Sequence, residues 1–167
     1  MGRGPRIGGS DVTPEQARAI GRACSVFALR RATRAVTQLY DDVLRPTGLR
    51  ATQYSVLAVI RASEPATQTE IARTAQMDAT TLTRALRPLE REGLVRVRLG
   101  ATDRRQRVVS LTAKGKRRLT RATAYWEKAQ EELSQRYGTV AVRELVGALH
   151  AAARATKHGS PHPPRSH

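Results

Sequence analysis

The chain has 167 residues, the size of one compact domain, and its 30 Lys and Arg against 14 Asp and Glu leave a formal net charge of +16. This excess predicts a polyanionic partner, with nucleic acid first and an anionic membrane surface second. The longest apolar run, YSVLAVI at 54–60, is far shorter than the roughly 20 residues of a membrane span, and the start, MGRGPRIGGS, lacks the apolar stretch of a signal peptide. We therefore expect a cytoplasmic protein with no membrane partner.

Cysteine and histidine usage gives no sign of a metal or a cofactor. Cys24 is the only cysteine, so no internal disulfide can form, and no set of Cys and His has the spacing of zinc ligands. His158, His162 and His167 crowd the end of the chain, where a solvated tail is favoured over a metal site. Stability must then come from packing.

The two ends of the chain differ in composition from the rest. Residues 1–12 and 157–167 are rich in Gly, Pro, Ser and basic residues without apolar periodicity, which predicts disordered tails around a folded domain at 13–156. The domain begins with Thr13 as an N-cap, followed by proline and a capping-box glutamine, and opens a long helix over 14–44. Apolar residues spread over more than one face of this helix, which favours burial against a second subunit.

A pair of short helices is predicted near the middle of the chain. One helix runs from about Thr52 to Pro65, and the capping box Thr67-Gln-Thr-Glu70 opens the next, which ends at about Ala75. After a tight turn, Asp78 is a good N-cap for a further helix. Two short helices joined in this way predict a helix-turn-helix.

The period of the apolar residues then changes to two. Residues 94–99 place Val and Leu on one face and Arg on the other, and a second run follows at 107–111 after the polar loop GATDRRQ, which predicts a β-hairpin. Thr112 caps the first of two further helices within 113–155. The order predicts a mainly α fold with a small β-hairpin wing, a winged helix-turn-helix.

The helix after Asp78 has two faces of opposite character. Three leucines share one face, and polar and basic side chains lie almost opposite. Arginine can donate two hydrogen bonds to guanine O6 and N7, and threonine can meet a thymine methyl group or a phosphate. Pro88 should bend the helix and leave Arg91 to a phosphate or to solvent. The residues of this helix expected to bind DNA are Thr80, Thr81, Thr83, Arg84 and Arg87.

The hairpin tip carries a second basic group. Arg104 and Arg105 have the reach to enter a minor groove, where groove width and negative potential favour arginine. Asp103 is expected to form an ion pair with Arg105 or Arg107 and so to fix the loop. The DNA-binding residues expected in the wing are Asp103, Arg104, Arg105 and Arg107. A solvated basic face is the alternative for both groups of arginines, but their place on a helix-turn-helix and the adjoining hairpin favours DNA.

Three segments together resemble the multiple antibiotic resistance regulator (MarR) family over about residues 17–155. They are RPTGLRATQYSVL at 45–57, LTRALRPLEREGLV at 82–95 and DRRQRVVSLTAKG at 103–115. The resemblance implies an intertwined helical dimer in which helices at 14–44 and 113–155 form the dimer interface and the lobe at 52–111 binds DNA. It also implies a repressor, bound to an inverted-repeat operator and relieved by a small anionic, often phenolic, ligand. Pro88 and Gln106, where the family often has an acid, are departures that bear on wing geometry.

The segment ACSVFALRRATRAVTQLY at 23–40 is similar to the organic hydroperoxide-sensing branch of that family, in which a cysteine on the first helix is oxidised. That cysteine position is held here by Val26, two residues after Cys24, and such an offset turns a helical side chain by about 200°. An inert cysteine is therefore favoured, with a thiol-based oxidant sensor as the alternative. The candidate ligand or redox residues are Cys24, Arg30, Tyr40, Tyr54 and Trp126, with plain packing as the alternative for the aromatic ones.

Two other function classes have less support. A sequence-neutral architectural or RNA-binding protein would use the same charge, but six aromatic residues without a Gly-aromatic strand motif give little support for base stacking. An enzyme is not favoured, because the sequence has no phosphate-binding glycine loop, no paired catalytic carboxylates with a supporting motif and no nucleophile with a recognisable base. We expect a transcriptional regulator with double-stranded DNA, its own second copy and a small-molecule effector as partners.

Overall fold

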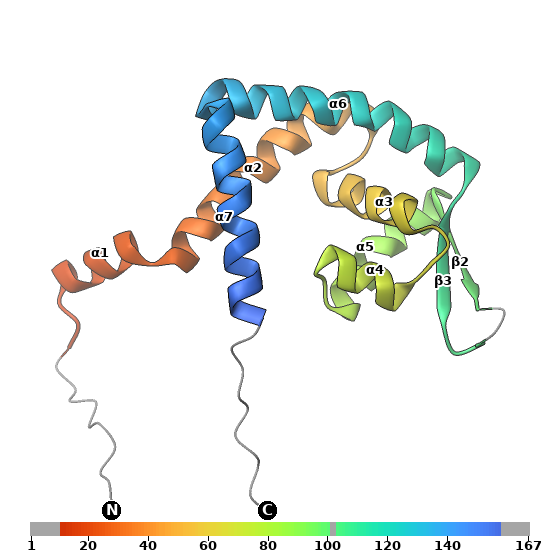
Figure 1. Cartoon of the computed structure of the whole chain (residues 1–167), viewed down its shortest axis with the longest axis horizontal. Helices are drawn as coiled ribbons and strands as arrows, with labels where there is room; N and C mark the ends of the chain where they lie inside the picture. Colours follow the sequence, from red (N-terminus) through yellow and green to blue (C-terminus); the bar gives the residue numbers. More distant parts are fainter. Residues whose placement is uncertain (1–10, 101–102, 158–167) are drawn as a thin grey trace, which may run out of the picture. The chain divides into compact units, whose positions relative to one another are not determined.

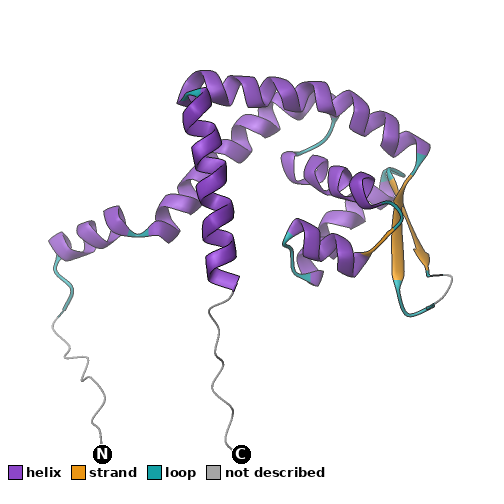
Figure 2. Cartoon of the chain, viewed as in Figure 1, coloured by secondary structure: helices purple, strands orange, loops and turns teal. Residues whose placement is uncertain are grey.

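The computed structural model describes residues 11–100 and 103–157, which are mostly helical with one small sheet (Figures 1 and 2). The helices are α1 (Pro14–Ala23), α2 (Ser25–Leu44), the 3-10 helix η1 (Arg45–Thr47), α3 (Ala51–Ser63), α4 (Gln68–Ala75), α5 (Ala79–Arg91), α6 (Ala113–Tyr137) and α7 (Thr139–Lys157). The strands are β1 (Ala66–Thr67), β2 (Val95–Leu99) and β3 (Arg107–Leu111). The described residues divide into two compact units, with the division between residues 38 and 39. The three C-terminal histidines and most of both predicted tails lie outside the described residues.

The prediction of one continuous helix over 14–44 is wrong. Thr13 caps α1 as expected, since its hydroxyl accepts a hydrogen bond from the Gln16 amide (3.2 Å) and the Gln16 side chain accepts one from the Thr13 amide (2.9 Å). The helix then ends at Cys24, which has extended backbone angles (φ −74°, ψ 110°). Gly21 in the last turn of α1 weakens the helix by about 1 kcal/mol relative to alanine. Because Cys24 is not helical, the 200° argument about its direction does not apply.

The second unit holds the hydrophobic core, which α3, α4, α5, the sheet and α6 enclose. Its buried side chains include Leu57, Ile60, Ile71, Leu82, Leu89, Leu94 and Val109. The sheet is antiparallel in the order β1, β3, β2, with Val109 opposite both Ala66 and Val97. The hairpin of β2 and β3 was predicted, but β1 was not, because two residues are too short to show an alternating pattern. No helix in the described part of the chain has the length and apolar character to cross a membrane.

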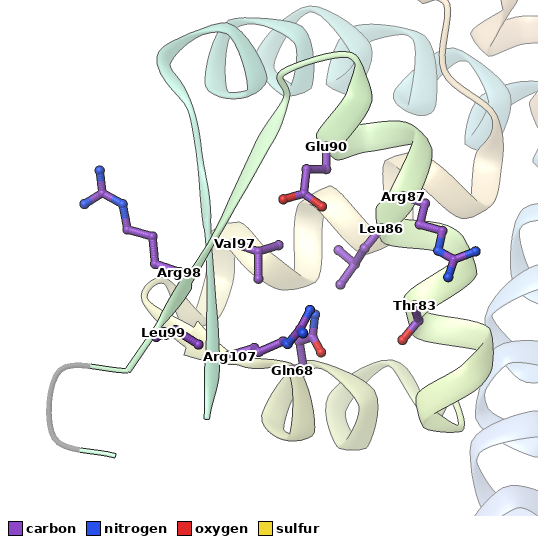
Figure 3. A pocket seen from close by; sticks show the side chains of 9 residues that line it. All are labelled: Gln68, Thr83, Leu86, Arg87, Glu90, Val97, Arg98, Leu99 and Arg107. Atoms are coloured by element: carbon purple, nitrogen blue, oxygen red, sulfur yellow. The ribbon is translucent and has the colours of Figure 1, made fainter. Parts of the chain in front are cut away.

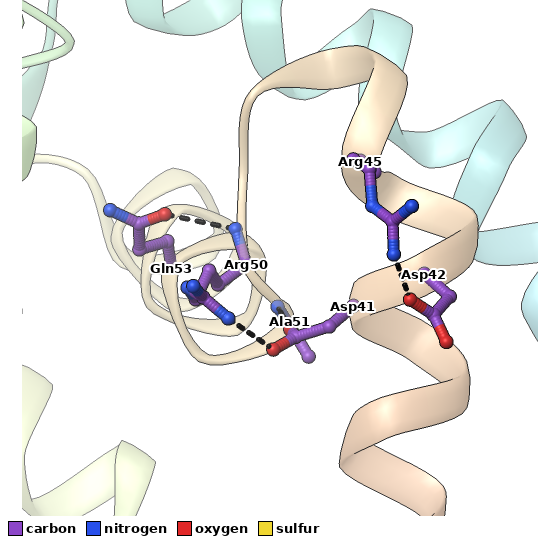
Figure 4. A network of polar contacts seen from close by, with 6 residues as sticks. All are labelled: Asp41, Asp42, Arg45, Arg50, Ala51 and Gln53. Atoms are coloured by element: carbon purple, nitrogen blue, oxygen red, sulfur yellow. Dashed lines mark hydrogen bonds and ion pairs between the residues drawn. The ribbon is translucent and has the colours of Figure 1, made fainter.

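One carboxylate positions the start of α3 (Figure 4). Asp41, near the end of α2, accepts a hydrogen bond from the Ala51 amide at 2.7 Å and forms an ion pair with Arg50 at 3.0 Å. The Arg50 amide donates to the Gln53 side chain at 2.9 Å. The first amides of a helix have no partner within it, so Asp41 does here what an N-cap side chain usually does.

Candidate nucleic-acid interface

The two helices of the helix-turn-helix, α4 and α5, begin at capping side chains. The Thr67 hydroxyl accepts from the Glu70 amide at 3.2 Å, and Glu70 accepts from the Thr67 amide at 2.8 Å, which confirms the predicted capping box. At the start of α5, Asp78 accepts from the Thr81 amide at 2.8 Å and from the Thr81 hydroxyl at 2.6 Å. The turn between the helices contains Gln76 in the left-handed conformation (φ 52°). These local bonds set where α5 begins and thus which of its residues point outward.

The capping bonds lower the pKa of both carboxyl groups. The backbone amide of Thr67 and then its hydroxyl lower the pKa of Glu70. The hydroxyl of Thr81 and then its backbone amide lower the pKa of Asp78. In each case a donor favours the ionised carboxylate.

Acid is therefore expected to destabilise the helix-turn-helix. A carboxyl whose folded pKa lies below its unfolded value contributes stability that is fully present above the unfolded value, about 4, and that is lost as pH falls through the folded value. Asp78→Asn keeps a capping oxygen but carries no charge, so its free energy of unfolding should depend less on pH below about 5 than that of the wild type. Urea unfolding followed by circular dichroism across this range would check it. An equally steep acid dependence in both proteins would contradict it.

Helix α5 presents a polar face away from the core. Leu82, Leu86 and Leu89 are buried, as the predicted wheel requires. The exposed residues include Thr80, Thr81, Thr83, Arg84, Arg87 and Arg91. The helix continues through Pro88 to Arg91, so all of these residues lie on one helix. Bending at Pro88 stays a prediction.

Two of the threonine hydroxyls on α5 already donate hydrogen bonds inside the protein. The Thr81 hydroxyl donates to Asp78, and the Thr83 hydroxyl donates to the Ala79 carbonyl oxygen at 2.7 Å. A hydroxyl group has one hydrogen to give. Neither side chain can donate to a phosphate without losing its internal bond.

A groove of about 310 Å³ separates α5 from the inner face of the wing (Figure 3). It is lined by Gln68, Thr83, Leu86, Arg87, Glu90, Val97, Arg98, Leu99 and Arg107. In Figure 3, Gln68 and Arg107 lie together at one end of the groove and Glu90 lies at the other, while the Arg98 side chain points away. A second hollow, on the outer side of α5, is lined by Ala79, Thr80, Thr83, Arg84 and Arg87. Thr83 and Arg87 border both.

The Asp103 side chain bonds to a backbone amide in the described part of the wing loop, and its predicted ion pair is wrong. The Asp103 carboxylate instead accepts from the Arg105 amide at 2.9 Å. Within the described residues it forms no ion pair with Arg105 or Arg107. An aspartate that accepts from the amide two residues on forms an Asx turn, which fixes a tight loop without any charge partner. Arg104, Arg105 and Arg107 are thereby left exposed.

Sequence reasoning missed Glu64, which joins the base of the wing to two helices. Its side chain is only 13% exposed. One carboxylate oxygen accepts from the Leu111 amide of β3 at 3.0 Å, and the other lies 3.3 Å from Lys116 of α6 and 3.6 Å from Arg61 of α3. An acid just before a proline in a basic chain was the signal available. Glu64 fixes where the wing leaves the lobe.

The candidate ligand residues fall into two groups. Tyr54 and Trp126 stack, with ring centroids 6.2 Å apart and an angle of 20° between their planes. The Tyr40 hydroxyl donates to the Gln130 side chain at 2.6 Å, and burial raises the pKa of Tyr40. Cys24, half-buried, and Arg30, exposed, belong to the other unit. Among the described residues, no group of His, Cys, Asp and Glu is arranged to hold a metal ion.

Comparison with known proteins identifies relatives over most of the chain. Residues 49–106 match the model of the MarR family. The chain is 32% identical over 108 residues to the uncharacterized HTH-type transcriptional regulator YwoH of Bacillus subtilis, a match that covers 65% of this chain and 78% of YwoH. The M. tuberculosis transcriptional regulator MosR in complex with DNA is 42% identical, with a TM-score of 0.69 over 80% of this chain and 98% of MosR. The transcriptional repressor CouR, bound to a 23-mer DNA duplex, is 28% identical, with a TM-score of 0.73 over 80% of this chain and 95% of CouR.

Proposed function

Since this chain belongs to the MarR family of DNA-binding transcriptional regulators, we propose that it is a homodimeric repressor of an inverted-repeat operator, released by a small anionic ligand. The observation that carries the proposal is the outer face of α5. There Arg84 and Arg87 are exposed on a helix whose opposite face is buried and whose start is fixed by Asp78. A rigid helix with a basic outer face is what entry into a major groove requires.

In this arrangement α5 lies in the major groove and the wing tip enters the neighbouring minor groove. Arg84 and Arg87 donate to guanine edges, and Arg104 and Arg105 lie where the minor groove has its negative potential. The sugar-phosphate backbone that separates the major groove from the minor groove then crosses the protein groove between α5 and the wing. Gln68 and Arg107, at one end of that groove, are placed to contact its phosphates.

Exposed apolar side chains support a dimer. The large apolar residues on α1, α2 and α7 that are between 40% and 63% exposed are Ile20, Val26, Phe27, Leu29, Val140, Val146 and Leu149. Each of the two units thus exposes apolar side chains on helices outside the DNA-binding lobe, which favours a covering partner, and a two-fold operator requires a two-fold protein. We therefore expect sedimentation as a dimer at micromolar concentration. A monomer would contradict the proposal.

The proposed function is tested by selecting duplexes from a randomised library with the purified protein. We expect the selected sequences to share an inverted repeat with half-sites about one helical turn apart, protected together in a footprint. Affinity for a scrambled duplex should be about 10³-fold lower or more. Equal affinity for selected and scrambled duplexes would instead favour the sequence-neutral nucleic-acid-binding protein.

Release by a ligand is tested on the same selected duplex. The stacked Tyr54 and Trp126 offer a flat apolar surface suited to a phenolic acid, so salicylate, used as the probe, should lower DNA affinity. The thiol alternative has one observation in its favour, since Cys24 lies at a break between helices. Cys24→Ser should respond to salicylate like the wild type. Oxidant release that disappears in this variant would assign the sensor role to Cys24.

A further inference from the structure

We propose that Thr83 recognises a thymine in each half-site through its γ-methyl group and not through its hydroxyl. This rests on the proposed function of α5 as the helix that enters the major groove. Of the groups that base pairs present in that groove, the C5-methyl of thymine is the apolar one, and it is matched by methyl groups of the protein. A threonine can contact a base through its hydroxyl, by a hydrogen bond, or through its methyl group, by an apolar contact. The hydrogen bond that the Thr83 hydroxyl makes favours the second.

The hydroxyl of Thr83 is committed to its own helix. It donates to the carbonyl oxygen of Ala79, four residues earlier, at 2.7 Å. In this arrangement, common for threonine in helices, the branched side chain is held in one rotamer. Its only hydroxyl hydrogen is used, so a contact with an acceptor on a base edge or a phosphate would cost the internal bond. The methyl group is free to make contact at no such cost.

The surroundings of Thr83 also favour an apolar contact. Thr83 lies on the flank of α5 that faces the wing, and it borders both the outer hollow with Arg84 and the groove with Leu86 and Val97 (Figure 3). A base edge that meets Arg84 or Arg87 therefore has Thr83 beside it. A thymine methyl group placed there would be removed from water and would pack against carbon atoms of the protein.

Thr81 provides a matched control on the same helix. The sequence made Thr81 a candidate DNA contact, but its hydroxyl donates to the carboxylate of Asp78 at 2.6 Å and Thr81 borders neither the groove nor the outer hollow, so we assign it to the cap of α5 and not to the base contacts. Thr81→Ser and Thr83→Ser each remove one methyl group and keep the hydroxyl. Only the second should change thymine recognition.

The experiment replaces thymines of the selected duplex by uracil, one symmetric pair at a time, which removes the C5-methyl and nothing else. At one position the wild type should lose affinity about fourfold for each half-site, the fold-change that corresponds to about 0.8 kcal/mol for one buried carbon. Thr83→Val, which keeps the γ-methyl group and has a second methyl group in place of the hydroxyl, should show the same loss on uracil. Thr83→Ser should bind thymine and uracil duplexes equally at that position, while Thr81→Ser should behave like the wild type.

Failure of the inference is distinguishable from failure of the proposed function. Suppose that the wild type prefers the selected duplex but that uracil changes the affinity of Thr83→Ser and of the wild type equally, or that Thr83→Val, and not Thr83→Ser, loses the preference for thymine over uracil. The methyl contact is then wrong, and α5 remains the recognition helix. If the wild type does not distinguish selected from scrambled duplexes, the proposed function is wrong, and the methyl contact falls with it.

Discussion

Gly115→Ala is expected to lower the free energy of unfolding of the DNA-binding lobe by about 3 kcal/mol, the upper end of what overpacking costs. A Cβ atom at residue 115 would lie 2.0 Å from the carbonyl oxygen of Leu94 and 2.9 Å from its carbonyl carbon. These are backbone atoms, so no side-chain rotation can relieve the clash. The start of α6 or the start of the wing has to move.

The same contact links the wing to α6. The Thr112 amide donates to the carbonyl oxygen of Leu94 at 3.0 Å. The Thr112 hydroxyl donates to the carbonyl oxygen of Gly93 at 2.7 Å and accepts from the Gly115 amide at 3.0 Å. An alanine at residue 115 would therefore disturb DNA binding as well as stability.

Chemical denaturation of both proteins measures the effect. Gly21→Ala is the control, because a Cβ there meets nothing within 4 Å and alanine favours the helix by up to about 1 kcal/mol. Equal unfolding energies for Gly115→Ala and the wild type would contradict the packing described here.

The parts of the fold that the sequence predicted depend on neighbouring residues. The capping boxes at Thr13 and Thr67 join residues three apart, and the leucine face of α5 repeats at helical spacing. Both patterns are visible in the letters of the chain. The helix-turn-helix and the hairpin followed from them.

The parts that were missed depend on residues far apart or on backbone geometry. Glu64 accepts from the amide of Leu111, 47 residues later, and β1 exists only because β3 pairs with it. Asp103 was assigned an ion pair from charge alone, while the loop offered it an amide. At Cys24 neither proline nor a helix-ending glycine marks the break. Packing of one segment against another decided the cases of Glu64 and β1, and local backbone geometry decided those of Asp103 and Cys24.

Arg84→Ala is expected to weaken binding to the selected operator about 5- to 150-fold for each half-site, which corresponds to about 1 to 3 kcal/mol. Arg84 is exposed on the outer hollow of α5 between Thr80 and Arg87, where a guanidinium group can donate two bonds to one guanine. The loss should therefore be confined to duplexes that carry that guanine. A second selection with the variant should show one base position relaxed in each half-site.

Arg105→Ala is the contrasting variant, because a minor-groove arginine gains from potential and from released counterions and carries little base information. The backbone amide of Arg105, and not its side chain, donates the hydrogen bond to Asp103, so this bond should remain without the guanidinium. We expect weaker binding to selected and scrambled duplexes alike, with a shallower dependence of affinity on salt. Titrations of both duplexes over a salt series measure this for each variant. Unchanged operator preference in Arg84→Ala, or unchanged affinities and salt slopes in Arg105→Ala, would show that α5 and the wing do not divide recognition in this way.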